Sequence, residues 1–276
     1  MKRLYLIDGT FELFRGYYAV PSKVNSAGQE VAAVQATLRS IKKLIRDEKV
    51  EYIACATDHV IESFRNQLFD GYKTSAGIPE DLYSQFPILE KALSAMGITL
   101  WAMKKFEADD ALATATVKYT DFFEQIIICS PDKDMMQCVN KKVICIDRIR
   151  DKTYNRESVY EKFGVYPEQV ADYLALVGDS ADGIPGLPGF GAKSTAMLLD
   201  AFQHIEQVSD RIDNWPAIRG RERLFNTFNE NLEEVKLYKV LATLRLDVPL
   251  KQNPKELFYH PEKIQKKILE KLEISL

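Results

Sequence analysis

The stretch RLYLIDGTF, residues 3–11, decides the fold: an apolar run, read as a strand over 3–7, ends directly at Asp8 and a glycine turn. A short apolar run bounded by turn residues is typical of a buried strand. Similar runs recur further along, at 51–57, 98–102, 125–129 and 142–146. Helical patterns lie between or beyond them, at 31–48, 80–96, 108–119 and 156–163. Strands that alternate with helices predict an α/β protein whose central sheet is mostly parallel and flanked by helices.

Beyond about residue 167 the β-branched runs stop and short helical patterns follow. This second region contains a Pro/Gly-rich stretch at 183–191 and a final amphipathic helix over 261–272. We therefore expect a C-terminal helical region beside the α/β part.

The composition excludes several classes of protein. In 276 residues there is no apolar run long enough to cross a bilayer, and residues 4–7 do not resemble a signal-peptide core, so we expect a cytoplasmic protein with no membrane partner. The three histidines are widely separated, which argues against a zinc enzyme or a histidine triad. The four cysteines form no C-x-x-C pair and are expected to be buried thiols; they are Cys55, Cys129, Cys138 and Cys145.

Nine carboxylates cluster close to the predicted ends of strands and helices. They are Asp8, Asp58, Glu107, Asp109, Asp110, Asp132, Asp134, Asp179 and Asp182. Ligands gather at the carboxyl ends of parallel strands, where Asp8, Asp58 and Asp132 fall on this interpretation. Taken singly, each cluster also fits a helix cap or a turn. Together the carboxylates would repel one another unless cations lie among them, so we expect two Mg²⁺ ions, with Mn²⁺ able to substitute.

Two Mg²⁺ ions held by carboxylates suit the hydrolysis of phosphodiester bonds. The ions clamp the attacking and leaving oxygens and lower the pKa of a bound water, so no side-chain general base is required. The net charge of −3 does not argue against a nucleic-acid substrate, because the nine clustered carboxylates account for the acidity and leave a basic remainder.

The segment GLPGFGAKSTAMLL, residues 186–199, predicts a tight glycine hairpin followed by an amphipathic helix. Glycines let the backbone approach a ligand, and the free N–H groups of the helix start bind phosphate with help from Lys193. The spacing from Gly186 to Lys193 is one residue too long for a P-loop. A helix-hairpin-helix that holds duplex DNA by its backbone fits better, and an ordinary glycine-rich turn between helices is the alternative.

Another polar segment, FDGYKTSAGIPED at 69–81, is long and lies between helical patterns. Loops of this length inside a compact domain are usually functional, so we expect substrate contacts there. The opening D-G-T also occurs in haloacid-dehalogenase phosphatases, but Leu6 stands where those enzymes need a nucleophilic aspartate.

Taken together, these motifs closely resemble the bacterial 5′-nuclease family, meaning the 5′→3′ exonuclease domain of DNA polymerase I and the related flap endonucleases. The matching segments are LIDGTFELFRGYYA (6–19), NSAG (25–28), TDHVIESFR (57–65), GYKTS (71–75), EADD (107–110), SPDKDMMQ (130–137), YLALVGDSADGIPGLPGFGAKSTA (173–196) and YKVLATLRLDVPL (238–250). The resemblance implies a monomeric hydrolase of replication and repair, with exonuclease and flap endonuclease action. Its substrates would be DNA with a free 5′ end, a 5′ flap or a nicked duplex.

The resemblance also implies how the chain is divided. The parts are an α/β catalytic domain over 1–166 with a helical arch at about 69–96, and a helical region over 167–276 with the helix-hairpin-helix at about 183–200.

Carried over by position, all nine carboxylates match the family's metal site. Asp179 and Asp182 would complete the second metal position, and the other seven would surround the catalytic pair, with Asp8 and Asp132 counted as catalytic. Arg65 and Lys73 match catalytic basic residues that approach the scissile phosphate.

The DNA contacts are carried over in the same way. Tyr72 matches an aromatic residue that stacks on the terminal base, and Arg15 matches a basic position. The hairpin would hold the downstream duplex and often binds K⁺ through its carbonyls in this family; its residues are Gly189, Gly191, Lys193 and Ser194.

Two positions depart from the family pattern. Ala76 stands where an arginine is usual, so the arch would grip a flap more weakly. Gly183 replaces the usual asparagine after Asp182, which would loosen the second metal loop.

Two other functions remain open on the sequence alone. One is a non-catalytic, structure-selective DNA-binding relative of the same fold, and the other is a single-strand ribonuclease with a similar acidic site. Retention of every carboxylate disfavours a pure binder, because negative charge beside a phosphate backbone weakens binding. The duplex-binding hairpin disfavours the ribonuclease.

Overall fold

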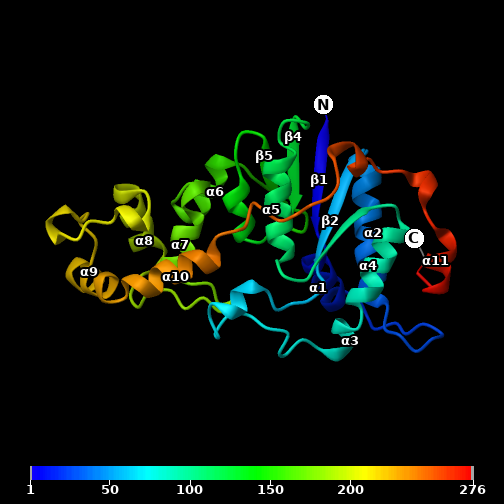
Figure 1. The fold of residues 1–276 in the computed structure, drawn as a ribbon, viewed down its shortest axis with the longest axis horizontal. Coiled ribbons are helices and arrows are strands. Elements are labelled where there is room, and N and C mark those ends of the chain that lie inside the picture. Colours follow the sequence, from blue (N-terminus) through cyan, green and yellow to red (C-terminus); the bar gives the residue numbers. More distant parts are fainter. Residues whose placement is uncertain (1, 275–276) are drawn as a thin grey trace.

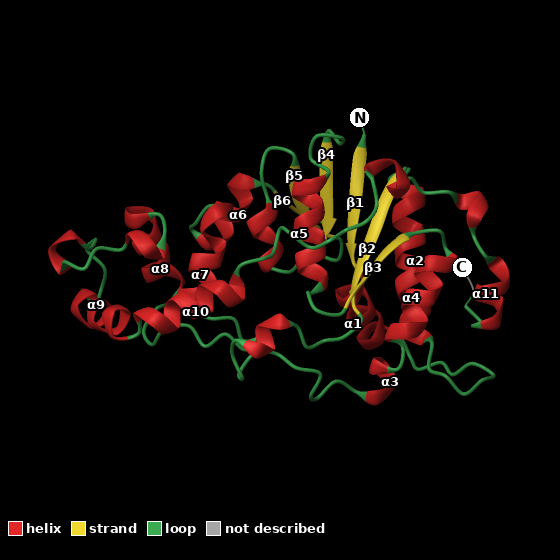
Figure 2. Ribbon diagram, viewed as in Figure 1, coloured by secondary structure: helices red, strands yellow, loops and turns green. Residues whose placement is uncertain are grey.

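Six strands form a single sheet in the computed structural model, which describes residues 2–274 (Figures 1 and 2). The strands are β1 (Arg3–Asp8), β2 (Tyr52–Asp58), β3 (Thr99–Met103), β4 (Gln125–Cys129), β5 (Val143–Asp147) and β6 (Lys152–Tyr154). Their order is β3-β2-β1-β4-β5-β6. Strands β1 to β5 are parallel and β6 is antiparallel to β5, which confirms the mostly parallel sheet. Strand β6 was not predicted, because three residues at an edge carry almost no hydrophobic pattern.

The strand order changes direction at β1, which pairs with β2 on one side and β4 on the other. Ile7 is in register with both Cys55 and Cys129, so the three strands end at nearly the same level. A crevice opens outside the carboxyl ends of such strands at the switch point, and ligands bind there. Asp8 is the last residue of β1 and therefore lies at this crevice.

Eleven α-helices surround the sheet and extend beyond it within residues 2–274. They are α1 (Gly9–Ala19), α2 (Ala32–Asp47), α3 (Glu80–Tyr83), α4 (Phe86–Ala95), α5 (Ala108–Lys118), α6 (Arg156–Phe163), α7 (Val170–Val177), α8 (Ala192–Phe202), α9 (Arg221–Glu230), α10 (Leu232–Ala242) and α11 (Lys266–Lys271). None of them is long and apolar enough to span a membrane. Helices α8 and α9 lie at one end of the molecule and α11 at the other (Figure 1).

Alternation along β1 separates two hydrophobic layers. Leu4 and Leu6 face a core shared with α5 and the helical region, whereas Tyr5 and Ile7 face a core built by α2, α4 and α11. Because both faces of the strand are covered, the run LYLI is apolar throughout rather than alternating with polar residues.

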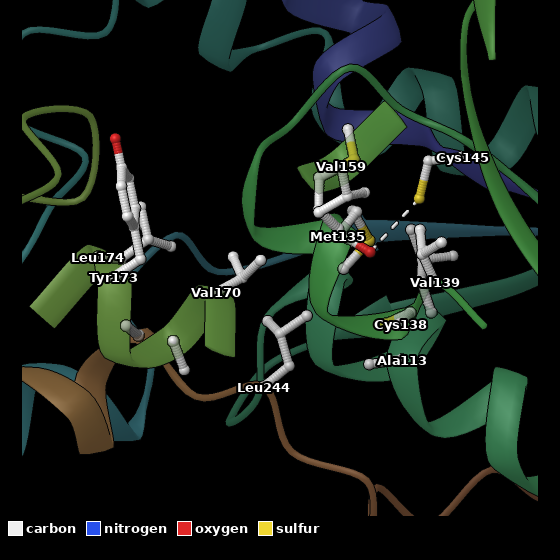
Figure 3. Close-up of a cluster of buried hydrophobic side chains, with 14 of the residues drawn as sticks. Ala113, Met135, Cys138, Val139, Cys145, Val159, Val170, Tyr173, Leu174 and Leu244 are labelled. Atoms are coloured by element: carbon white, nitrogen blue, oxygen red, sulfur yellow. Dashed lines mark hydrogen bonds between the residues drawn. The ribbon is translucent and has the colours of Figure 1, made fainter. Parts of the chain in front are cut away.

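The core on the α5 side continues without a break into the helical region (Figure 3). Val170 and Leu174 of α7 and Leu244 after α10 belong to the same buried cluster as Ala113 of α5. In this cluster the thiol of Cys145 donates to the carbonyl of Met135 over 3.3 Å. The glycine hairpin that precedes α8 is therefore attached to the sheet through one continuous core.

Three helices differ from the predicted ranges. Helix α1 was not predicted, because it begins at Gly9 and contains Gly16; a Cβ on Gly16 would lie 2.8 Å from the carbonyl oxygen of Ala33 in α2. The range 80–96 is interrupted, since Pro87 has no N–H for the preceding turn. The range 261–272 is interrupted because the N–H of Gln265 donates to Ala95 instead of to its own helix.

The segment 69–96 is not a helical arch in this structure. Residues 69–79 form no helix and run past the carboxyl ends of the strands (Figure 2). The helical part, α3 and α4, carries Ile88, Leu89 and Leu93 into the core on the α2 side. Burial of this apolar face keeps α4 against the sheet. Residues 69–79 form a loop, which is tied to the core on the α5 side by the buried ring of Tyr72.

Candidate metal centre

Two aspartates enter the crevice directly from strand ends. Asp8 accepts the N–H of Phe11 (2.9 Å) through Oδ1 and the hydroxyl of Ser130 (2.8 Å) through Oδ2. Asp58 accepts the N–H of Ala108 (2.7 Å), the first residue of α5. These bonds hold both carboxylates at the carboxyl ends of β1 and β2, where the sequence placed them.

Asp109 of α5 and Asp132, three residues beyond β4, share the electrostatic environment of Asp8 and Asp58. Burial raises the pKa of Asp109 well above its ordinary value, and the charges of Asp8 and Asp132 raise it further. Burial also raises the pKa of Asp8, to about 7, with Asp132 and Asp58 contributing. Asp8, Asp58, Asp109 and Asp132 therefore repel one another electrostatically, and a cation among them would relieve this repulsion.

A second group consists of Asp134, Asp179 and Asp182. One carboxylate oxygen of each lies within 4.8 Å of the others, and all three residues are buried. The Oδ1 atom of Asp134 is buried yet has no hydrogen-bond partner among the described residues. A buried oxygen without a donor is costly, and oxygen ligands at this spacing suit a hard divalent cation. The residues present therefore fit a metal ion.

Two lysines neutralise part of this charge. Lys133 lies between Asp132 and Asp134 in sequence, and its Nζ is 2.6 Å from Asp179. The Nζ of Lys73 is 2.8 Å from Glu107, which interacts with Asp58 of the first group, and 2.8 Å from Asp182 of the second group. Lys133 was not predicted as a site residue, although its position inside the motif S-P-D-K-D was the available signal.

Glu107 caps the start of α5 and is held by several donors. Its Oε1 accepts from the hydroxyl of Ser63 (2.7 Å) and from Arg65 (2.9 Å), and its Oε2 faces Lys73. Burial alone would raise the pKa of Glu107, but the charges of Lys73 and Arg65 outweigh it and lower the pKa to about 2. Ser63, like Ser130, is a supporting residue that the sequence motifs did not reveal.

Arg65 has a different position from the one predicted. Its side chain is 1% exposed and forms a bidentate pair with Asp110 at 2.7 and 2.8 Å. The remaining donors bond the carbonyls of Leu241 (2.8 Å) and Thr243 (3.0 Å). Because every guanidinium nitrogen is engaged inside the protein, Arg65 is not available to a phosphate, and we correct it to a structural residue.

Asp110 is likewise not available to a metal ion. Its side chain is fully buried, and each oxygen accepts one bond from Arg65. The same oxygens also accept the N–H groups of Glu107 (3.0 Å) and Arg245 (2.9 Å). With four donors the carboxylate has no free lone pair, so it supports the start of α5 rather than joining the metal ligands.

Tyr72 also lies elsewhere than predicted, and Arg15, which was matched to a basic position of the family, lies beside α2. Tyr72 is 3% exposed within the core on the α5 side, and its hydroxyl donates to Glu107 (3.3 Å), so its ring is not available for stacking on a base. Arg15 pairs with Glu12 and donates to Ser40 (2.7 Å) in α2. These partners place Arg15 against α2 rather than among the acids of the crevice.

The hairpin before α8 has the predicted form. Gly186 and Gly189 adopt positive φ, +69° and +89°, which glycine tolerates best. Gly191 is the N-cap of α8, and its N–H donates to the hydroxyl of Ser194 (3.0 Å). Lys193 is exposed in the first turn of α8, so the N–H groups and the positive charge face outward together.

Without divalent ions, the stability of the protein is expected to fall as the pH rises. The raised pKa of Asp8, about 7 against 3.8, favours folding fully below about pH 4, and this contribution is lost as the pH passes about 7. Metal ions bind the ionised form, so the rise in Tm on adding Mg²⁺ should be larger at about pH 8 than at about pH 6. Thermal unfolding with Mg²⁺ and with chelator at both pH values measures this difference. An equal rise in Tm at the two pH values would contradict the raised pKa of Asp8.

The chain combines an α/β sheet that has buried carboxylates at the carboxyl ends of its strands with a glycine hairpin before α8. Two family models match nearly the whole chain. The 5′-3′ exonuclease N-terminal resolvase-like domain matches residues 3–164, and the 5′-3′ exonuclease C-terminal SAM fold matches residues 165–265. The chain belongs to the 5′-3′ exonuclease family, which confirms the resemblance inferred from the motifs.

Individual relatives agree with this assignment. A 5′-3′ exonuclease of Aquifex aeolicus is 31% identical over 277 residues, covering 100% of this chain and 91% of that protein. DNA polymerase I of Rhizobium leguminosarum is 32% identical over 268 residues, covering 94% of this chain but only 26% of the polymerase. The chain therefore corresponds to one part of the polymerases that it matches.

A solved structure confirms the fold. The flap endonuclease of bacteriophage T5, in a pseudo-enzyme–product complex with DNA and metal ions, matches with a TM-score of 0.71. The match covers 99% of this chain and 100% of that one at 22% identity.

Proposed function

We propose that this protein is a Mg²⁺-dependent, structure-selective 5′-nuclease that hydrolyses DNA with a free 5′ end, a 5′ flap or a nick. The observation that carries the proposal is the buried group of Asp134, Asp179 and Asp182, in which the Oδ1 atom of Asp134 has no hydrogen-bond partner among the described residues. Family membership supports 5′-3′ exonuclease and flap endonuclease action on such ends.

The two groups of carboxylates would hold the metal ions. Bound Mg²⁺ would polarise the scissile phosphate and supply an activated water. Asp134, Asp179 and Asp182 are close enough to share one ion. A second ion would take its ligands from the crevice group, namely Asp8, Asp58, Asp109 and Asp132.

The other side chains would position the substrate. Lys73 lies between Glu107 and Asp182, and with 28% of its side chain exposed it is accessible to a phosphate. Outward N–H groups at α8 and the charge of Lys193 would hold the duplex without reading its bases. The K⁺ implied at the hairpin belongs to the same proposal and rests on the family resemblance alone.

Cleavage of a 5′-labelled flap DNA, with Mg²⁺ and with chelator, tests the proposed function. We expect short labelled products cut near the flap junction, only with Mg²⁺. Binding without cleavage would instead indicate the non-catalytic relative, and cleavage of the equivalent RNA alone would indicate the ribonuclease. Replacing Mg²⁺ by Mn²⁺ should preserve the product lengths, because both ions accept oxygen ligands.

Replacing Lys193 by alanine should weaken binding to all duplex sequences about equally. Loss of one phosphate contact is expected to reduce the slope of log K against log salt by about 1. Fluorescence anisotropy over a salt series, in chelator to prevent cleavage, measures both quantities. Lys42→Ala is the matched control, since Lys42 is exposed on α2 away from the α8 end of the molecule (Figure 1). A loss confined to some sequences would contradict the phosphate contact.

A further inference from the structure

The loop 69–75 lies against the turn that carries Asp179 and Asp182. That turn is closed by two backbone bonds, from Asp179 to Ile184 (2.7 Å) and from Ile184 to Asp179 (2.8 Å). Gly183 lies inside it with φ +75°. A Cβ on Gly183 would overlap the carbonyl oxygen of Gly71 and would lie 3.5 Å from the N–H nitrogen of Lys73.

This close approach sets the position of Lys73. Its N–H donates to the carbonyl of Asp182 (3.0 Å), and its own carbonyl accepts from the side-chain amide of Asn66 (2.9 Å). With the backbone held in this way, the Nζ atom reaches both Glu107 and Asp182. The close contact between Gly183 and Gly71 therefore supports the backbone from which Lys73 reaches Glu107 and Asp182.

We propose that Gly183 is a positioning residue for Lys73. Only glycine leaves room for the backbone at Gly71, and that room places the amine of Lys73 between the two halves of the metal site. A side chain at 183 would lift residues 71–73 away from the turn and separate the amine from Asp182. The catalytic consequence rests on the proposed nuclease function, whereas the placement of the loop does not.

From the sequence, Gly183 was expected to loosen the second metal loop, and the proposed role is the opposite. The absence of a side chain does not loosen the turn, which keeps both of its closing backbone bonds. It allows a second segment to dock on the turn instead. The docked segment is the loop in which substrate contacts were predicted.

Tryptic cleavage after Lys73 tests the placement without any nuclease activity. We expect Gly183→Ala to be cut there about tenfold faster than the wild type, because proteolysis follows the population of the open loop. Gly220→Ala is the matched control: Gly220 has the same φ of +75°, but a Cβ there would meet no atom within 4 Å. It carries the same backbone strain without the overlap, so its cleavage after Lys73 should be unchanged. Equal rates in the two variants would overturn the proposal.

Hydrogen exchange on the wild-type protein gives a second test that needs no variant to fold. The N–H of Lys73 should exchange at least about tenfold more slowly than that of Gly77, because it donates to Asp182. Gly77 lies two residues beyond the loop 69–75, and a Cβ on it would meet nothing within 4 Å. Similar exchange rates at the two positions would show that the loop is not docked, and the proposal would fail.

A double-mutant cycle separates a positioning role from a merely structural one. Gly183→Ala should lower kcat on flap DNA about tenfold with little change in KM, and it should have no further effect in a Lys73→Ala background. Equal effects in both backgrounds would show that Gly183 does not act through Lys73. If the wild type does not cleave DNA, the proposed function fails, while the tryptic and exchange results still decide where the loop lies.

Discussion

Replacing Asp132 by asparagine is expected to reduce turnover of flap DNA by about a thousandfold or more, because a lost metal ligand removes several kcal/mol of transition-state stabilisation. Asp132 is only half-buried and interacts electrostatically with Asp8, Asp109 and Asp182, so it lies where the two acid groups meet. Binding of DNA should remain intact or become stronger, since the substitution also removes a negative charge near the phosphates. Single-turnover cleavage and anisotropy in chelator measure the two effects separately.

Asp121→Asn provides the matched control for this substitution. Asp121 is exposed just before β4, whereas Asp132 follows the same strand at its carboxyl end. The change of charge is identical, so turnover should stay within about twofold of the wild type if only the site matters. Unchanged turnover in Asp132→Asn itself would refute the assignment of the crevice carboxylates to the metal ions.

Replacing Arg65 by methionine is expected to destabilise the protein by about 3–5 kcal/mol, because it leaves a buried carboxylate without its partner. Asp110 would lose two charge-assisted hydrogen bonds in a fully buried position, and Leu241 and Thr243 would lose their donor. Urea unfolding monitored by circular dichroism measures the change in free energy of unfolding.

Arg245→Met is the control for Arg65. The side chain of Arg245 also lies near the ring of Phe64, but it pairs with Asp247 in an exposed position. Exposed ion pairs contribute less than about 1 kcal/mol, so this variant should remain close to the wild type. If Arg65→Met kept full stability and lost only turnover, Arg65 would act on the phosphate after all and our correction would be wrong.

The sheet and the meeting of acids at its edge could be predicted because they depend on local patterns. Each strand is a short apolar run, and parallel strands end on the same side, so Asp8, Asp58 and Asp132 converge without knowledge of the packing. The grouping of Asp134 with Asp179 and Asp182 was not predicted, because the family resemblance placed Asp134 with the catalytic pair. This grouping depends on how the turn 178–184 docks beside the residues after β4.

The roles of Arg65, Asp110 and Tyr72 could not be predicted from patterns. Each depends on contacts with chain far away in sequence, such as the carbonyls at Leu241 and Thr243 that saturate Arg65. A motif that shows a basic residue near acidic ones does not distinguish a phosphate-binding arginine from a buried ion pair. In the same way, nothing local reveals that the position at 183 lies under a second loop.

The bonds from Arg65 to Leu241 and Thr243 also have a consequence for the order in which the protein is made. Synthesis proceeds from the N-terminus, so the strands and all nine carboxylates leave the ribosome long before residues 241–243. Until then the guanidinium of Arg65 has only Glu107 and Asp110 as partners. The start of α5 is not yet linked through Arg65 to residues 241–243. A nascent chain thus contains all nine carboxylates well before the hydrogen bonds of Arg65 to Leu241 and Thr243 can form. We therefore expect the metal centre to become ordered only after residues 241–243 have emerged from the ribosome, so that a shorter nascent chain has no nuclease activity.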